Sequence, residues 1–272
     1  LQLDARTEET VTYKELQVKT VKCALWLKQQ GIGRDDVVSV CSNNHLDSIV
    51  PCLSAAYVAA IFNPINEDIN LSTVLHYINL TRPKAIFCTK KPLVEIRKAL
   101  KETNYNIKVV VFDENSNELS FSDILNRYSD AEVANFQYVE HGLKKTACIL
   151  LSSGTTGMPK GVELSNNTLL DWAFEDIMNI KNEATLWFSP LFWISGVCLN
   201  LGTIVHGRKV LLYPVFDEEM TCVLIEKYKV KTMKKVTRNT DARLNTFIFL
   251  QNLDFIFDGK TFYKTTKLDS YL

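Results

Sequence analysis

The chain has 272 residues, of which 46% are hydrophobic and 23% charged, as in an ordinary globular protein. Lysine plus arginine and aspartate plus glutamate number 31 each, so the net charge is zero and we expect no nucleic-acid partner. The seven cysteines contain no C-x-x-C pair, which argues against a zinc site and a disulfide framework. We find no secretory signal at the start of the chain and no apolar run that comfortably spans a membrane.

Strand-like apolar runs alternate with amphipathic helical stretches, which predicts a layered α/β fold. Thr12 and Glu15 form a capping-box pattern before the first helix, and Gly31 stands where that helix should end. After this helix the pattern predicts, in order, a strand at 36–41, a helix at about 47–60, an extended segment at 61–65, a helix at 72–80, a strand at 85–89, a helix near 94–102 and a strand at 108–112.

The second half begins with a continuously apolar run at 146–151, typical of a strand covered on both faces. Further on we expect a brief strand at 161–164, a helix at 168–180 capped by Ser165 or Asn166, strands at 184–188 and 208–213, a helix at 218–228 and a strand at 230–233. Residues 234–272 show no sustained period, and short strands at 247–250 and 255–257 would have no obvious partner. We therefore predict one domain over 1–233 and an unassigned tail over 234–272.

Between the strands at 146–151 and 161–164 lies a loop with the sequence SSGTTGMPKG. Its glycines let a backbone approach a ligand closely, its N–H and hydroxyl groups donate hydrogen bonds, and its lysine adds a positive charge. These are the parts of a phosphate-binding loop, placed after a buried strand where α/β proteins usually bind ligands. The spacing fits neither G-x-x-x-x-G-K-[ST] nor G-x-G-x-x-G, which disfavours a P-loop NTPase and a Rossmann dehydrogenase. The alternative is a flexible surface turn.

The whole ten-residue string resembles the loop of the adenylate-forming enzymes, the AMP-dependent synthetase/ligase family of acyl-CoA synthetases, 4-coumarate:CoA ligases and beetle luciferases. The segments VTYKEL at 11–16, AYVAA at 56–60 with NPIN at 63–66, KAIFC at 84–88 and GVELS at 161–165 are also similar to that family. The resemblance implies the N-terminal subdomains of the adenylate-forming fold, truncated. It also implies that ATP phosphates contact Ser152, Ser153, Gly154, Thr155, Thr156, Gly157 and Lys160.

A second motif, SPLFW at 189–193, stands in place of the family's P-x-F-H motif. The resemblance implies that Phe192 and Trp193 line the acyl pocket, with Trp193 in place of the usual histidine. Ordinary core packing is the alternative for both residues. The four histidines lack metal-ligand spacing, so we expect each to be a surface or helix residue, and we assign no metal ligand and no catalytic residue: His45, His76, His141 and His206.

The family's chemistry implies ATP-dependent activation of a small carboxylic acid to an acyl-AMP, followed by a thioester with coenzyme A, using ATP, Mg²⁺ and coenzyme A. The sequence does not identify the acid, and the candidates that the resemblance implies are fatty, aromatic or luciferin-like. We find neither the aromatic-Gly-x-Thr-Glu motif nor the C-terminal lysine of the family, so we expect the 272-residue chain alone to be inactive. The alternative is a non-catalytic remnant that binds a nucleotide or a protein. The expected location is cytoplasmic or peroxisomal, although Ser270-Tyr271-Leu272 differs from the family's peroxisomal signal.

Overall fold

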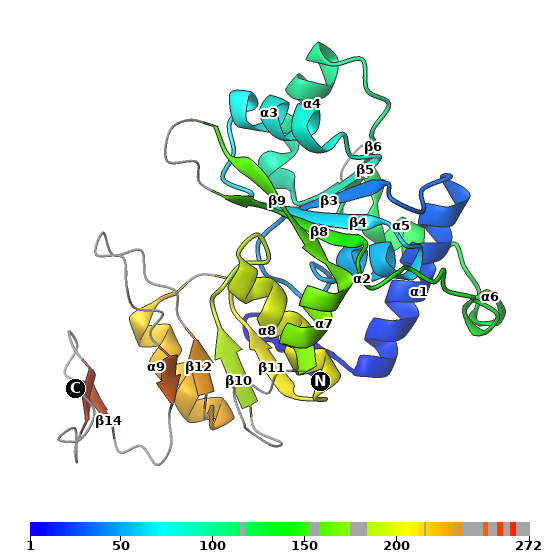
Figure 1. The fold of residues 1–272 in the computed structure, drawn as a ribbon. Helices are drawn as coiled ribbons and strands as arrows, with labels where there is room; N and C mark the ends of the chain where they lie inside the picture. Colours follow the sequence, from blue (N-terminus) through cyan, green and yellow to red (C-terminus); the bar gives the residue numbers. More distant parts are fainter. Residues whose placement is uncertain are drawn as a thin grey trace.

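The computed structural model describes residues 1–114, 118–152, 158–174, 184–214, 216–230, 232–234, 247–249, 255–257 and 262–264. In this part of the chain two large β-sheets, a separate two-stranded sheet and nine helices form a mixed α/β structure (Figure 1). The larger sheet has the strand order β7-β6-β5-β3-β4-β8-β9, and the smaller one has the order β13-β12-β10-β11-β1-β2. The predicted α/β fold is therefore confirmed.

The larger sheet is parallel except at β9, which pairs antiparallel with β8. Residues at every position of β3 and β4 are buried, which explains why both sequences are mostly apolar. Its strands are β3 (Val37–Cys41), β4 (Ile61–Ile65), β5 (Ala85–Cys88), β6 (Lys108–Val111), β7 (Leu119–Ser120), β8 (Thr146–Ser152) and β9 (Lys160–Ser165).

Helices cover both faces of this sheet (Figure 1). One face, with Val38 and Phe87, packs against α1 (Tyr13–Gln29), α2 (Val50–Tyr57) and α5 (Phe121–Leu125). The opposite face, with Ile86 and Val111, packs against α3 (Leu71–Thr81) and α4 (Lys90–Glu102). The short helix α6 (Asp130–Ala134) buries none of its residues. Alternating side chains of each strand thus serve two separate cores.

The start and end of α1 are as predicted. Thr12 is the N-cap, its hydroxyl accepts from the Glu15 N–H, and the Glu15 carboxylate accepts from the Thr12 N–H. Gly31 follows with φ +72°, a conformation that favours glycine. The helix predicted at 47–60 is shorter because Ala59 takes φ +60°, and the helix predicted at 94–102 begins four residues earlier, with Pro92 in its first turn.

The smaller sheet joins the start of the chain to its second half. Strand β1 (Gln2–Asp4) pairs parallel with β11 (Lys209–Leu212) and antiparallel with β2 (Thr10–Val11). The remaining strands are β10 (Ala184–Trp187), β12 (Thr232–Lys234) and β13 (Phe247–Phe249), and the associated helices are α7 (Asn166–Phe174), α8 (Ile194–Val205) and α9 (Glu218–Tyr228). The predicted helix at 168–180 is described only as far as residue 174.

Two expectations about this half were wrong. Helix α8 was not predicted, because it is apolar along most of its length and its N-cap residue, Trp193, makes no side-chain cap. The strands expected without partners do pair: β13 pairs with β12, and β14 (Phe255–Phe257) with β15 (Phe262–Lys264). A search of the described helices finds none long and apolar enough to cross a membrane.

Candidate functional site

The β8–β9 hairpin carries the predicted phosphate-binding loop. The antiparallel register pairs Ser152 with Lys160, and the Ser152 hydroxyl donates to the Lys160 carbonyl at 3.4 Å. Both residues are exposed at the two ends of the loop. The other predicted phosphate contacts lie outside the described residues: Ser153, Gly154, Thr155, Thr156 and Gly157. A hydroxyl donor and a cation therefore stand together at the base of the loop, and this donor set suits a polyphosphate.

The second motif forms a tight turn that leads into α8. The carbonyl of Ser189, a buried residue, accepts from the Asn44 side-chain amide at 3.0 Å, and the Gly196 N–H donates to the Trp193 carbonyl at 2.9 Å. A Cβ on Gly196 would lie 2.0 Å from the Pro190 carbonyl oxygen, so only glycine fits there. The turn is thus held by hydrogen bonds to backbone groups, and the aromatic side chains of the motif take no part in closing it.

Phe192 and Trp193 lie beside each other on this turn, with ring centroids 5.9 Å apart. Trp193 is 41% exposed, so the core-packing alternative is wrong for this residue. Leu191, with 2% of its surface exposed, fills the core position instead. The aromatic pair is therefore free to face a ligand.

The hairpin and the aromatic pair line the same cavity, which has a volume of about 720 Å³. Its walls come from the end of β4, from α3, from β8 and β9, and from the turn before α8: Pro64, Ile65, Asn66, Tyr77, Leu150, Leu151, Ser152, Pro159, Val162, Leu164, Phe192, Trp193 and Ile194. None of these described lining residues carries a charge, and most are apolar. The cavity can hold an uncharged apolar group beside the base of the loop.

Several of these wall residues were missed in the sequence. Val162 and Leu164 alternate along β9, a strand with an exposed first half, and they line the cavity together. Apolar residues at every second position of an exposed edge strand could have predicted that one side of β9 faces a ligand. Tyr77 and Ile65 carried no such signal, because Tyr77 reaches the cavity through the packing of α3 beside the sheet and Ile65 from the end of β4.

A second, polar cavity of about 450 Å³ lies where β3, β4, β5 and β6 end: Arg6, Asn43, His45, Glu67, Thr89, Lys90, Lys91, Phe112 and Asp113. Its acidic groups already have partners in the protein. The Glu67 carboxylate accepts from the Asn43 N–H and from the Lys91 ammonium, and Asp113 accepts from the Lys90 N–H. We therefore assign this cavity no ligand.

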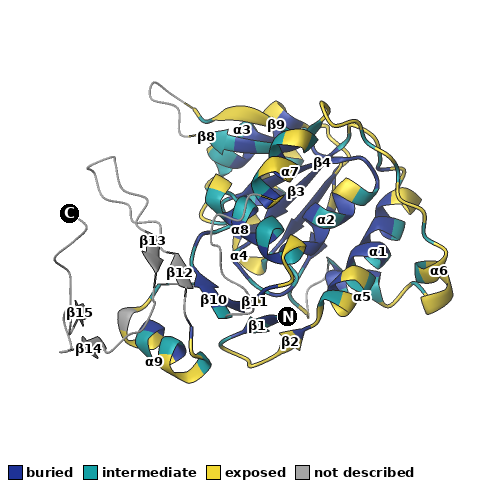
Figure 2. Cartoon of the chain, turned by 60° about the horizontal axis from the view of Figure 1, so that its bottom comes forward, coloured by how far each residue is buried: buried dark blue, intermediate teal, exposed yellow. Residues whose placement is uncertain are grey.

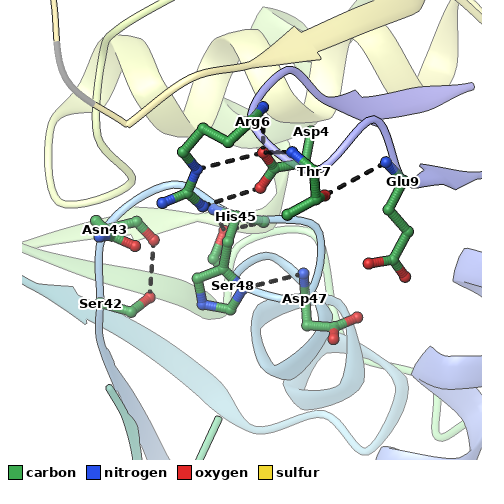
Figure 3. A network of polar contacts seen from close by, with 9 residues as sticks. All are labelled: Asp4, Arg6, Thr7, Glu9, Ser42, Asn43, His45, Asp47 and Ser48. Atoms are coloured by element: carbon green, nitrogen blue, oxygen red, sulfur yellow. Dashed lines mark hydrogen bonds and ion pairs between the residues drawn. The ribbon is translucent and has the colours of Figure 1, made fainter. Parts of the chain in front are cut away.

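Two groups of polar contacts border this second cavity, one within the loop after β1 and one within the segment after β3 (Figure 3). Burial of Asp4 by itself raises its pKa, but hydrogen bonds and charge from Arg6 hold that pKa below its ordinary value. Burial of His45 lowers its pKa to about 4. Its Nδ1 accepts from the Asp47 N–H at 3.2 Å, and its ring packs edge-on against Phe112. The expectation of a surface or helix position was therefore wrong for His45, which lies largely buried in a loop.

Among the described residues, no cluster of three or more histidine, cysteine, aspartate or glutamate side chains could hold a metal ion. His76 lies on α3, as expected of a helix residue, and His206 is exposed at the end of α8. His141 lies in a loop between Asp35 and the Asn166 amide with its side chain 7% exposed, so the expectation of a surface or helix position was wrong for it as well.

Comparison with known proteins identifies the family. The model of the family described as "AMP-binding enzyme" matches residues 3–254. The chain is 27% identical to luciferin 4-monooxygenase from Photinus pyralis over 84% of this chain and 44% of that protein. It is also 27% identical to 4-coumarate–CoA ligase-like 9 from Arabidopsis thaliana over 85% of this chain and 41% of that protein.

A solved structure agrees with these sequence matches. The luciferase-like enzyme from the nonluminescent Zophobas morio mealworm superimposes with a TM-score of 0.79 at 26% identity, over 85% of this chain and 54% of that one. The chain spans less than half the length of the curated relatives named here. On the strength of the family match and this shared fold, the chain belongs to the family of AMP-binding enzymes.

Proposed function

We propose that this chain binds ATP at the β8–β9 loop and, in the working enzyme, contributes to activating a carboxylic acid as its adenylate. One observation carries the proposal: the base of the loop and the Phe192–Trp193 pair, about forty positions apart in sequence, line one cavity. Such an arrangement suits a reaction that joins the acid's carboxylate to a phosphate of ATP. Relatives named as CoA ligases make coenzyme A the thiol that would take up the activated acid.

The chemistry is a displacement in which an oxygen of the acid's carboxylate forms a bond to the α-phosphorus of ATP while the bond to pyrophosphate breaks. The task of the protein is to hold a polyphosphate and offset its charge. Lys160 would supply the positive charge, and the Ser152 hydroxyl would turn from the Lys160 carbonyl to donate its one proton to a phosphate oxygen. Mg²⁺ would be held by the phosphates of ATP together with water and one or two carboxylates, as is usual for this ion.

The cavity favours an acid whose remaining part is apolar and uncharged. Burying a second carboxylate against its described walls would cost several kcal/mol, since no cation among those residues could pair with it. A volume of about 720 Å³ also leaves room for an aromatic ring or a medium-length alkyl chain. We therefore propose a monocarboxylic acid of the fatty or aromatic class.

Calorimetric titration tests both parts without requiring turnover. We expect ATP with Mg²⁺ to bind the chain and to lose most of its affinity in Lys160→Ala, whereas Lys108→Ala, at the start of β6, should bind like the unaltered chain. Octanoate should bind better than octanedioate, a matched acid with a second carboxylate. No ATP binding, or equal binding by Lys160→Ala, would overturn the nucleotide assignment.

Acid-dependent exchange of pyrophosphate into ATP separates the catalytic function from the binding-module alternative. Exchange that disappears in Lys160→Ala would support catalysis by this chain and contradict the expected inactivity. ATP binding without exchange would favour the nucleotide-binding module.

A further inference from the structure

Helix α3 lies against the start of β9 at two points, on either side of Lys160. His76 Nε2 is 2.6 Å from the Pro159 carbonyl oxygen. One helical turn later, Leu80 Cδ2 lies 3.6 Å from where a Cβ on Gly161 would stand. Residues four apart lie on the same face of a helix, so one face of α3 follows the first residues of β9. Lys160 sits between the two contacts.

The partner of His76 determines the direction of this hydrogen bond and the tautomer of the imidazole ring. A carbonyl oxygen can only accept, so His76 Nε2 carries the proton and donates it. The neighbouring peptide group is planar and its N–H points away from its C=O. Holding the Pro159 carbonyl toward α3 therefore also turns the Lys160 N–H away from α3 and restricts rotation of this peptide group.

The bond from His76 holds the start of β9 from outside the hairpin. The antiparallel pairing of Ser152 with Lys160 closes the loop at its base, but β9 is the edge strand of its sheet, and no described strand pairs with its outer side. Met158 and Val162, close to Lys160, are 47% and 46% exposed, so packing does little to hold this stretch. The bond from His76 is a polar contact from a helix that is itself packed on the sheet.

We propose that His76 is a positioning residue that holds the Pro159–Lys160 peptide group so that Lys160 is presented to the phosphates of ATP. This proposal rests on the ATP-binding function proposed above. His76 acts through the backbone of Pro159 and does not itself contact the nucleotide. Loss of its donor should therefore weaken ATP binding by the value of one hydrogen bond and loosen the start of β9.

Three variants test the proposal. His76→Leu replaces the donor with an apolar side chain. His76→Gln keeps a side-chain N–H. His206→Leu makes the same exchange as His76→Leu at an exposed histidine at the end of α8. We expect His76→Leu to raise the dissociation constant for ATP about fivefold, the usual worth of one hydrogen bond. His76→Gln should recover most of this loss, and His206→Leu should bind ATP like the unaltered chain.

Hydrogen–deuterium exchange supplies a readout that does not depend on ATP. Peptides spanning residues 158–165 should exchange faster in His76→Leu than in the unaltered chain, while peptides from β3 and β4 should not change. If His76→Leu leaves both the ATP affinity and this exchange unaltered, or if His76→Gln recovers neither, the positioning role is wrong. If the unaltered chain binds no ATP, the proposed function fails, and faster exchange in His76→Leu would then show a tether without a role in nucleotide binding.

Discussion

The centre of the larger sheet and the hairpin at its edge are built from the same backbone pairing but differ in what their side chains do. Every residue of β3 and β4 is buried, whereas the first four residues of β9 are exposed (Figure 2). The centre holds the fold together through two hydrophobic cores. The edge contributes little to either core, so its sequence is free to carry glycines, hydroxyls and a lysine for binding a ligand. The predictions below test this division.

The largest effect should come from the centre. Phe87 is fully buried and contacts Trp26, Phe112 and Phe121 with its ring. Phe87→Ala should lower the free energy of unfolding by about 3–5 kcal/mol, because it leaves a cavity in the core. Val162→Ala on β9 should lower it by less than about 1 kcal/mol. Urea unfolding of both variants measures the difference, and similar losses would contradict the division.

Acid should destabilise the protein through His45, which borders the centre. Its pKa is about 4 in the folded chain, against about 6.5 for an unperturbed histidine. Between these values the unfolded chain binds a proton that the folded chain does not, so stability falls as the pH falls from 6.5 to 4, by about 3 kcal/mol. His45→Asn does not titrate, and it keeps an acceptor for the Asp47 N–H. Its free energy of unfolding should depend less on pH over this range; an unchanged pH dependence would contradict the buried, neutral state of His45.

A buried polar side chain ties β8 to the central strands. Asn63 is fully buried; its amide donates to the Ile149 carbonyl of β8 at 2.8 Å, and its side-chain oxygen accepts from the Ser39 hydroxyl at 3.1 Å. Asn63→Ala leaves both partners without their bond and should cost about 2 kcal/mol. A double-mutant cycle with Ser39→Ala should show coupling between the two residues. Additive losses would mean that the Asn63–Ser39 bond contributes nothing measurable.

We expect Lys160 to have the smallest effect on stability and the largest effect on ATP binding. Lys160 is exposed, so Lys160→Ala should change the free energy of unfolding by less than about 0.5 kcal/mol. The same variant should lose most of its ATP affinity. A large loss of stability would instead give Lys160 a structural role and contradict the division between the centre and the edge of the sheet.

The sequence was most informative where local rules decide the structure. Residues Thr12 and Glu15 predicted the start of α1 because a capping box depends only on neighbours, and the buried parallel strands showed as mostly apolar runs. Helix α8 was missed because its apolar residues extend beyond its buried face, which hides the helical period. The pairing of β1 with β11 joins residues about 200 positions apart, which no local pattern records.

The site follows the same rule. The loop at 152–161 and the motif at 189–193 were visible as strings, but their meeting in one cavity depends on how the two sheets pack. His76 was taken for an ordinary helix residue, because its contact with Pro159 spans 83 positions of sequence. The phosphate contacts of residues 152–157 and 160, and the division of the chain at 233, stay predictions.

Hydrogen–deuterium exchange of the unaltered chain with and without ATP and Mg²⁺ tests the central claim most directly, because it locates the binding site along the sequence. If the edge hairpin holds the nucleotide, ATP should slow exchange in peptides spanning 158–165, leave β3, β5 and β6 unchanged, and have no effect on Lys160→Ala. Protection confined to other segments, or protection that persists in Lys160→Ala, would contradict the assignment of ATP to the β8–β9 loop.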